Sequence, residues 1–584
     1  MLKRSAVSTL LLVVFSLAFS CKELVGRAPA KSPEPAPSFG PPIPATITVS
    51  PDRVTGQVPR VFRPSVMLTG SYDEAKMVFL QLPGKLGTVR WSVGQPIEQA
   101  RSLEEFQRLL ESVGPGAKRF EDKGAQLVIT LEGMPRWIAS RQEDKLAAPY
   151  GWSIRKASPP RDFKAYEQFV FETVRILNGK FGLNPLYEFW NEPNSRMFWV
   201  GTQQELFRTY AAFAVGARRA DPSARVGGLA VGSWENPREG EGGAPEPLLK
   251  AFIRFAGSTR PEGLKEPRLP LDFVSWHCFA RSPEEKWEGA LEIRDWLSAA
   301  GYDRNLPQVV DEWNRWSTFP EWYDLSRDSH MGAAYYAASA LAMDRAGVAC
   351  QAFANLQDFN DPPPGKVFIG DFGTLTRKPM VKKASFHVMH MMSLLEDKRV
   401  DVQVPQGVAE REGVGAIAAT GGNRLTLLVH RYGGDDTGAL VRSVRADGFQ
   451  RFSDLGVDNK DVVAFYVDNV PLPASAPAKT RKALERAVEN AKKAKQAPAS
   501  EVVVKLAIPG WEKPSRYEIY RVDENHHNPG VAYALALKAG ESQGNALAAA
   551  RKAEAFAPAL KGSGELPEIR LGAMAVVLVV LERN

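Results

Sequence analysis

The chain has 584 residues, 44% of them hydrophobic and 24% charged, which is long enough for two or three domains with substantial cores. Its 74 Lys and Arg residues against 67 Asp and Glu residues leave a formal net charge of only +7. A charge this small on a chain of this length argues against a nucleic-acid-binding surface. We therefore expect a globular protein whose partners do not include nucleic acid.

The first twenty residues have the pattern of an export signal. Lys3 and Arg4 precede an apolar run from Ala6 to Phe19, which is too short to span a membrane. Ser20-Cys21 resembles the lipobox of bacterial lipoproteins, so we predict a signal peptide over residues 1–20 and acylation at Cys21, with simple cleavage as the alternative. The protein is expected to be exported, as an outer-membrane or cell-surface lipoprotein or else as a periplasmic or secreted protein. Its only membrane contact would be the lipid anchor.

Residues 21–45 are rich in Pro, Ala and Ser and contain few residues that could form a core. Such a composition favours an extended chain, so we predict a lipid-anchored tether here. Ordered structure is expected from about Ile47.

Short apolar runs alternate with amphipathic stretches over residues 46–396, a pattern typical of β/α units. Eight predicted strands favour a (β/α)8 TIM barrel, and hence the α/β class. The alternative, an open doubly wound sheet, lacks its Gly-rich phosphate turn after the first strand. The predicted strands are Phe62–Met67, Thr88–Trp91, Gln126–Leu131, Pro185–Trp190, Arg225–Leu229, Leu271–Trp276, Gln308–Asp311 and Cys350–Asn355. The predicted helices include Ser102–Val113, Phe163–Leu177, Gln203–Arg219 and Met331–Arg345.

Residues 397–584 contain mainly alternating segments, which predict a C-terminal antiparallel β-sandwich domain. Within it, residues 474–499 are rich in Ala, Lys, Arg and Glu and predict a basic helical insertion exposed to solvent, with a polyanion-binding arm as the alternative. The predicted strands are Gly413–Ala419, Arg424–His430, Val462–Val467, Val502–Ile508 and Ala573–Leu581. The last run has β-branched residues and a charged end, which favour a core strand over a membrane segment.

The remaining cysteines and the histidines suggest neither a disulfide framework nor a metal centre. Cys278 and Cys350 fall in or just beyond predicted barrel strands, so we predict two buried free thiols. The seven histidines are scattered and include no His-x-His pair, which gives little support to a metal-dependent hydrolase. No metal and no cofactor are predicted.

Glu192 and Glu312 each follow a predicted barrel strand, the fourth and the seventh, and each lies beside Trp and Asn. The C-terminal ends of barrel strands surround one cleft, so both carboxyl groups are expected to point into it. Hydrolysis of a glycosidic bond requires such a pair, one acid to protonate the leaving oxygen and one carboxylate to meet the developing cation. Either residue alone would more often be a helix cap or surface acid, but the pair predicts a glycosidase site.

An ordered set of motifs resembles glycoside hydrolase family 39, the β-xylosidase and α-L-iduronidase family of retaining barrel enzymes. The set consists of Trp190-Asn191-Glu192-Pro193-Asn194, Asp221-Pro222-Ser223-Ala224-Arg225-Val226-Gly227-Gly228, Phe273-Val274-Ser275-Trp276-His277, Asp311-Glu312-Trp313-Asn314, Gly373-Thr374-Leu375-Thr376 and Asp523-Glu524-Asn525-His526-His527-Asn528. The resemblance covers most of residues 60–580.

The resemblance implies that Glu192 is the general acid/base and Glu312 the nucleophile. It implies that Asn191 binds the sugar 2-hydroxyl and that Arg90 lies near the nucleophile, where a structural salt bridge is an equal possibility. It also places His277 in the cleft, where we expect a sugar contact. Trp316 and Trp137 follow strands and are candidates for stacking on sugar rings, although packing explains each as well. Glu188 is expected to be paired within the barrel wall.

Two departures from the family pattern concern the substrate. Ser92 stands where many members have His after the second strand, and Phe279 where they have Tyr after the sixth. Both changes remove polar groups that would contact a terminal sugar, so an endo-acting polysaccharide hydrolase becomes an alternative to a β-xylosidase. Uronide binding would require cationic groups in the cleft, for which Arg136, Arg196 and Arg315 are candidates.

The sequence thus predicts a retaining glycoside hydrolase that acts on an oligo- or polysaccharide. The alternative is a noncatalytic carbohydrate-binding or cell-envelope polysaccharide assembly protein that has kept the same fold.

Overall fold

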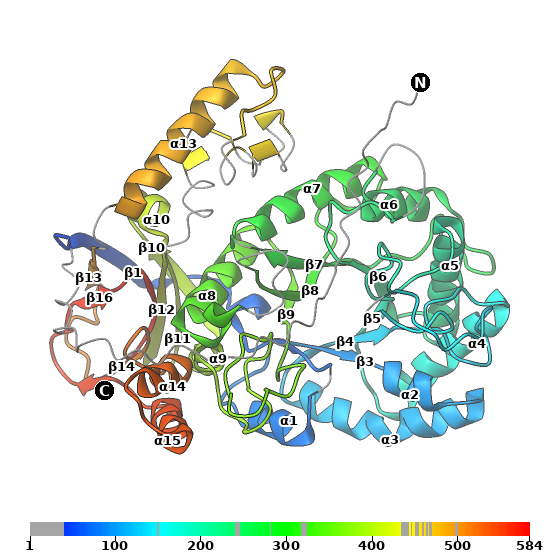
Figure 1. Cartoon of the computed structure of the whole chain (residues 1–584), viewed down its shortest axis with the longest axis horizontal. Helices are drawn as coiled ribbons and strands as arrows, with labels where there is room; N and C mark the ends of the chain where they lie inside the picture. Colours follow the sequence, from blue (N-terminus) through cyan, green and yellow to red (C-terminus); the bar gives the residue numbers. More distant parts are fainter. Residues whose placement is uncertain are drawn as a thin grey trace, which may run out of the picture.

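The computed structural model describes residues 40–69, 71–148, 151–239, 246–280, 282–316, 324–433 and 500–584, and, between them, 443–444, 447–449, 455–457, 461–462, 465 and 470–496. The predicted signal peptide, Cys21 and most of the tether lie outside these residues. A barrel and a sheet domain lie side by side, with helix α8 (His330–Arg345) between them (Figure 1).

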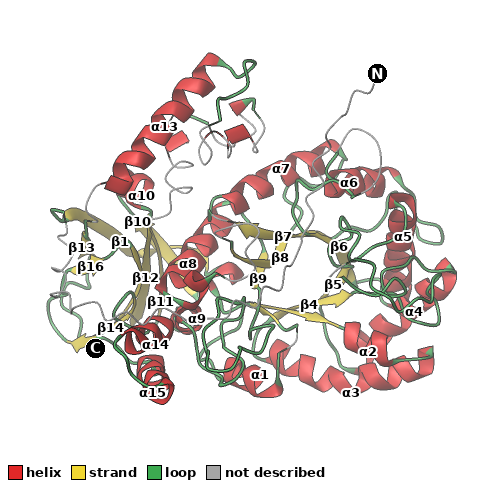
Figure 2. Ribbon diagram, viewed as in Figure 1, coloured by secondary structure: helices red, strands yellow, loops and turns green. Residues whose placement is uncertain are grey.

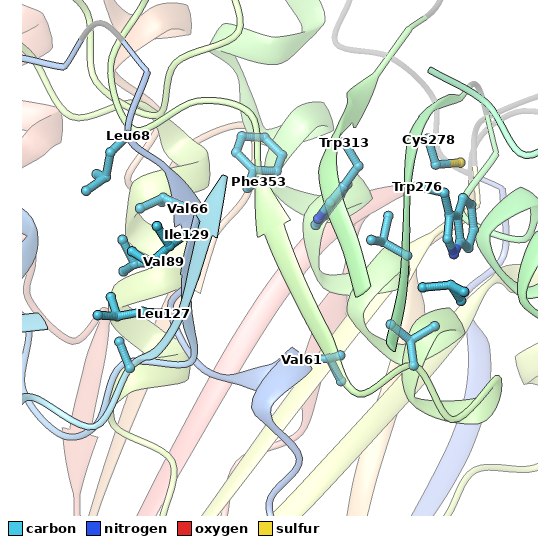
Figure 3. Packing of buried hydrophobic residues seen from close by; sticks show 14 of the residues in the cluster. Val61, Val66, Leu68, Val89, Leu127, Ile129, Trp276, Cys278, Trp313 and Phe353 are labelled. Carbon is cyan, nitrogen blue, oxygen red and sulfur yellow. The ribbon is translucent and has the colours of Figure 1, made fainter. Parts of the chain in front are cut away.

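Eight parallel strands close the barrel, as predicted. Register pairing runs from each strand to the next, and Val66 pairs with Phe353 to join the last strand to the first. Figure 3 shows apolar side chains of these strands, including Val89, Ile129 and Trp313, in one continuous core. The strands are β2 (Val66–Met67), β3 (Thr88–Ser92), β4 (Gln126–Leu131), β5 (Leu186–Phe189), β6 (Arg225–Val231), β7 (Phe273–Ala280), β8 (Gln308–Arg315) and β9 (Cys350–Phe353).

Helices surround the barrel strands (Figure 2). Their ends follow local capping rules: Ser102 caps α3 through the Glu105 N–H, and Thr202 and Glu205 form a capping box at the start of α5. The helices are α1 (Asp73–Leu80), α2 (Gly94–Gln99), α3 (Leu103–Asp122), α4 (Phe163–Val174, continued by a π-helical turn at Arg175–Lys180), α5 (Gln203–Ala220), α6 (Leu248–Ser258), α7 (Glu285–Ala299), α8 and α9 (Ala384–Ser393), with short 3-10 turns at Arg60–Phe62 and Leu325–Asp328.

The second domain is a single nine-stranded mixed sheet. Its order is β15-β14-β17-β12-β11-β10-β1-β13-β16, and all pairs are antiparallel except β1 with β13. Strand β1 precedes the barrel in the chain, so the sheet begins within residues that the sequence pattern assigns to tether and barrel. Hydrophobic alternation indicates a strand but carries no information about its partner. The strands are β1 (Ile43–Gln57), β10 (Lys398–Gln403), β11 (Val414–Gly421), β12 (Arg424–Tyr432), β13 (Val502–Ala507), β14 (Arg516–Val522), β15 (Leu560–Gly562), β16 (Ile569–Leu571) and β17 (Met574–Glu582).

Strand β17 is apolar from Met574 to Leu581 because both of its faces are buried. Val577 and Val579 join the core of the sheet itself, whereas Val576 and Leu578 join the barrel core through α8. Helix α8 is correspondingly rich in alanine and buried nearly all round, as a helix between two packed layers must be. Among the described residues, none of the helices is apolar over a stretch sufficient to cross a bilayer.

The basic insertion contains helix α13 (Ala478–Gln496), which projects from the sheet domain (Figure 1). One face of it is not exposed, since Leu484 and Val488 pack with Phe449 and Leu455 in a small separate core. Of the strand expected at Val462–Val467, residues 462 and 465 are helical and the others lie outside the described residues. Further short helices, which the sequence pattern did not suggest, are α10 (Gln406–Glu412), α14 (Pro529–Lys538) and α15 (Gln543–Glu554).

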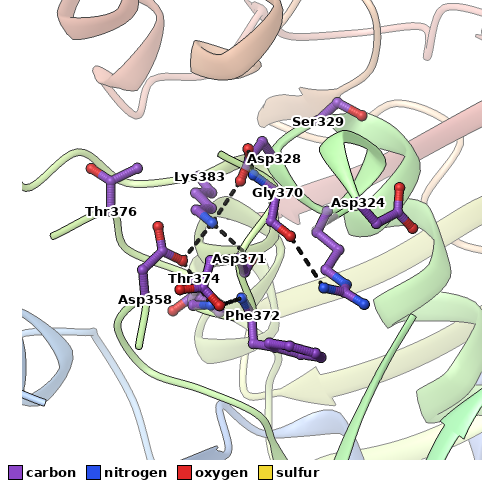
Figure 4. A network of polar contacts seen from close by, with 12 residues as sticks. Asp324, Asp328, Ser329, Asp358, Gly370, Asp371, Phe372, Thr374, Thr376 and Lys383 are labelled. Atoms are coloured by element: carbon purple, nitrogen blue, oxygen red, sulfur yellow. Dashed lines mark hydrogen bonds and ion pairs between the residues drawn. The ribbon is translucent and has the colours of Figure 1, made fainter. Parts of the chain in front are cut away.

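A buried ionic network fixes the loops that follow β8 and β9 (Figure 4). Lys383 Nζ lies 2.6 Å from carboxylate oxygens of both Asp328 and Asp358 and donates to the Asp371 carbonyl oxygen at 3.0 Å. All of these side chains are buried. Burial raises the pKa of Asp358 to about 8, although Lys383 opposes the shift.

Replacing Lys383 by methionine is expected to destabilise the protein strongly, because it leaves two buried carboxyl groups without their cation. Breaking a buried pair in this way costs about 3–5 kcal/mol, which should lower the midpoint of thermal unfolding by about 2–4 °C in a chain of this length. Calorimetry would measure this midpoint. Lys382→Met, at the partly exposed neighbouring position, is the matched control, and equal midpoints for the two variants would contradict the assigned role of the network.

Candidate active site

A polar layer lies directly above an apolar floor inside the barrel. The floor is a separate cluster formed by Val128, Leu186, Phe273, Val309 and Cys350. Side chains alternate along a strand, so the residues two positions further toward the C-terminal ends point into the same interior. Four of these five positions hold buried polar residues, Thr130, Glu188, Ser275 and Asp311, and the fifth is Ala352. The layer therefore forms the base of a site at the C-terminal mouth.

A bulge in β8 turns two consecutive acids toward this interior. Trp276 of β7 pairs with Val310 and His277 pairs with Glu312, so Asp311 is an extra residue without a partner in the register. As a result Asp311 is completely buried, and the Glu312 carboxylate still faces the mouth with 16% of the side chain exposed.

Glu192 lies in a strained loop after β5. Its φ is 44°, and Trp190 and Ala230 also have positive φ, at 69° and 52°. The Glu192 N–H donates to the Ala230 carbonyl oxygen at 2.8 Å, which joins the loop to the end of β6. A side chain at Gly232 would come within 3.1 Å of Glu192 Oε1, so glycine leaves room for the acid. Left-handed backbone at residues with a Cβ costs about 1–2 kcal/mol each, and such strain concentrates at functional sites.

Arg90, at 3% exposure, donates hydrogen bonds to two of the acids and to the asparagine. Its Nε donates to Glu188 Oε2 at 2.8 Å, and its Nη1 donates to Glu312 Oε2 at 2.9 Å. Its Nη2 donates to Asn191 Oδ1 at 3.0 Å. Arg90 therefore contacts Glu312 directly, and Asn191 is bound to the same guanidinium.

His277 is completely buried between the acids. Its Nδ1 lies 2.9 Å from Glu192 Oε1 and 3.7 Å from Glu312 Oε2. Its Nε2 lies 3.3 Å from Asp311 Oδ2, a contact of ion-pair type without hydrogen-bond geometry. The ring thus lies beneath the two glutamates with a carboxyl group at each nitrogen. This differs from the sugar contact expected for it.

The charges of the site are strongly coupled. Burial opposes protonation of His277, but Glu312 and Asp311 outweigh it and raise the pKa of the imidazole well above its usual value. Burial raises the pKa of Glu312, against the opposing effects of His277 and Arg90. Burial also raises the pKa of Glu188, to about 7, whereas Arg90 and His277 overcome burial and hold the pKa of Asp311 below its usual value.

The aromatic candidates differ in their surroundings. Trp316 follows β8, and its ring lies 5.7 Å from Phe279 and 5.8 Å from Phe372 between centroids. Trp137 follows β4, but its partly buried ring packs against Phe106 and Phe169 on helices α3 and α4. Trp316 is therefore adjacent to the departure at Phe279, whereas Trp137 belongs to the packing of the outer layer.

Ser92, the other departure, donates a 2.5 Å hydrogen bond to Glu132 Oε1, so a hydroxyl–carboxylate pair lines the end of β3 and β4.

Of the arginines considered for a uronide, Arg136 pairs with Asp144 and Arg315 pairs with Asp324. Arg196 is exposed on the loop after Glu192. Cys278 and Cys350 are buried free thiols, as predicted. Within the described ranges, no three or more His, Cys, Asp or Glu side chains are arranged to hold a metal ion.

Asp311 is the site residue that sequence reasoning missed. It lies in the motif Asp311-Glu312-Trp313-Asn314, but under strict alternation only one of two consecutive acids would face the barrel interior. A bulge leaves no signal in hydrophobic periodicity.

The fold and site together define a barrel protein of the glycoside hydrolase class, with two acids at its C-terminal mouth, one after β5 and one in β8. The sequence model described as glycosyl hydrolases family 39 matches residues 122–427, just over half of the chain. The chain belongs to this family, which confirms the resemblance seen in its motifs.

Relatives share parts of the chain. The beta-xylosidase of Caldicellulosiruptor saccharolyticus is 26% identical over 300 residues, which cover 48% of this chain and 55% of the relative. The match thus spans about half the length of that relative. Two solved structures share the fold at 18% identity: the GH39 enzyme from Xanthomonas axonopodis pv. citri, with TM-score 0.62 over 94% of this chain and 98% of that one, and a monomeric beta-xylosidase from Caulobacter crescentus CB15, with TM-score 0.60 over 92% and 99%.

Proposed function

We propose that the protein is a retaining glycoside hydrolase that cleaves an oligo- or polysaccharide by double displacement. The observation that carries the proposal is that Glu192 and Glu312 approach the same atom, His277 Nδ1, at 2.9 and 3.7 Å. The sum of these distances limits the separation of the two oxygens to about 6.6 Å. That limit accommodates the spacing of about 5–5.5 Å on which a retaining mechanism depends.

In the first step, Glu312 attacks the anomeric carbon while Glu192 gives its proton to the departing oxygen. The glycosidic bond breaks and a covalent glycosyl–enzyme ester forms. In the second step, Glu192 removes a proton from water, the water oxygen attacks the same carbon, and Glu312 leaves as a carboxylate. Two inversions retain the configuration, and both acids return to their starting states.

The surrounding cations support these roles. Arg90 contacts Glu312 at 2.9 Å and leaves that carboxylate oriented toward the mouth. Asn191 is held by Arg90 and is placed to hydrogen-bond a sugar hydroxyl next to the nucleophile. His277 presents its Nδ1 to Glu192 and so orients the proton donor.

For the substrate, the family and its named relative support a β-xylosidase-like activity. Ser92 and Phe279 alter the surroundings of the same acids, so endo action on a longer polysaccharide is the competing specificity. Export and acylation at Cys21 remain part of the proposal, on the N-terminal pattern of the sequence.

A panel of aryl glycosides and bacterial polysaccharides tests the proposal with purified wild-type protein. The configuration of the first-formed product, followed by NMR before mutarotation, should match that of the substrate. An inverted first product would refute the mechanism. Glycan binding without turnover, unaffected when both glutamates are replaced, would support the noncatalytic alternative instead.

The pH dependence should reflect the buried nucleophile. Glu312 must be ionised to attack, and burial raises its pKa, so the reactive form is lost at a higher pH than for an exposed glutamate. The acid limb of kcat/KM is therefore expected above the ordinary value of about 4.3, measured at constant ionic strength. An acid limb below that value would contradict the assignment.

A further inference from the structure

Beneath the catalytic pair lies a second pair of acids, Glu188 and Asp311, that the double displacement does not use. Both are completely buried, and they come from β5 and β8 on different sides of the barrel. Both approach the same atom, Arg90 Nε, at 2.8 Å for Glu188 Oε2 and 3.0 Å for Asp311 Oδ2. Asp311 also lies within hydrogen-bonding reach of Glu188.

If both acids were ionised, the hydrogen bonds around this pair would lack one hydrogen atom. Arg90 Nε carries a single hydrogen, which it donates to Glu188. Both oxygens of Asp311 and the Oε1 of Glu188 are buried without a hydrogen-bond partner. Two ionised carboxylates so close together would repel each other, whereas one protonated carboxyl group can donate to the other.

Their surroundings indicate which acid carries the proton. Asp311 faces two cations, Arg90 from β3 and His277 from β7. Among the described residues Glu188 contacts one cation, Arg90, and it accepts a hydrogen bond from the Thr130 hydroxyl of β4 at 2.8 Å. The anion is therefore better stabilised on Asp311, in agreement with a pKa for Glu188 near 7 and a lowered pKa for Asp311.

We propose that Glu188 and Asp311 form a proton-sharing pair that positions the two catalytic acids. Ionised Asp311 holds Arg90 and His277, which in turn contact Glu312 and Glu192. Because Glu188 is protonated, the negative charge of Asp311 is not opposed by a second carboxylate in the buried layer. Neither residue touches the substrate, so both are positioning residues. The inference depends on the roles proposed for Glu192 and Glu312.

Replacing each acid by its isosteric amide tests the two residues one at a time, at positions that are equally buried. Glu188→Gln replaces one neutral donor by another and should lower kcat by less than tenfold. Asp311→Asn removes the anion and should lower kcat at least 100-fold, with KM changed less than threefold. Because the Asp311 carboxylate helps to keep His277 protonated, its loss should also shift the basic limb of the kcat/KM profile to a pH about one unit lower. Asp358→Asn, at an equally buried acid of the Lys383 network, should keep the wild-type pH profile.

An infrared measurement tests the shared proton without turnover. At about pH 6, the spectrum of the wild type minus that of Glu188→Gln should show a carboxylic-acid C=O band and no carboxylate band. A carboxylate band there, equal kinetic damage by the two substitutions, or a wild-type pH profile in Asp311→Asn would overturn the inference. Absence of wild-type turnover would instead refute the proposed function, and the infrared result would still decide the proton's position.

Discussion

Replacing Glu312 by alanine is expected to abolish measurable turnover, with kcat lowered on the order of 10⁴-fold or more. The substitution removes the atom that forms the covalent bond, and no other described carboxyl group takes its place, because Asp311 is completely buried beneath it. Rates on an activated aryl glycoside, measured with enough protein to detect residual activity, would give the magnitude.

Azide should restore part of the activity of Glu312→Ala. The small anion fits where the carboxylate was and attacks the anomeric carbon directly, so the glycosyl azide should have the inverted configuration. Glu246→Ala, which removes only a surface pair with Arg254, is the control and should behave as wild type. Full activity in Glu312→Ala would show that the nucleophile has been assigned to the wrong residue.

Replacing Glu192 by alanine is expected to lower turnover by about 10²–10⁴-fold, in a way that depends on the leaving group. A poor leaving group needs the proton from Glu192, whereas an acidic phenol departs without it. The loss should therefore be largest for natural glycosides and smallest for activated aryl glycosides. Rates across a series of phenols of different acidity would measure this dependence.

Azide distinguishes the two variants by stereochemistry. In Glu192→Ala the glycosyl–enzyme still forms on Glu312, and azide needs no general base to attack it, so the product should keep the configuration of the substrate. Equal losses for every leaving group, or an inverted azide product, would contradict the acid/base role of Glu192.

Much of the barrel could be predicted from the chain alone. Each predicted strand overlaps an observed one, because a buried parallel strand is a short apolar run bounded by helices and turns. The second domain was harder to predict. Strand β1 pairs with β10 and β13, which follow it by hundreds of residues, and pairing across such a separation leaves no local pattern. Helices α14 and α15 were not predicted, because both are short and lie between segments whose alternating pattern is typical of strands.

The sequence by itself identified Glu192 and Glu312 as the candidate pair of catalytic acids, because each stands at a strand end in a motif short enough to be recognised locally. The resemblance carried by its motifs also predicted Arg90, Asn191 and His277 as their neighbours. The tertiary structure alone decided how these groups act on one another. The bulge in β8 placed Asp311 under His277, and closure of the barrel brought Glu188 to Arg90 across about a hundred residues of chain. Distances, burial and the charges that follow from them arise only when the strands meet, because the field at each carboxyl group is produced by residues remote in sequence.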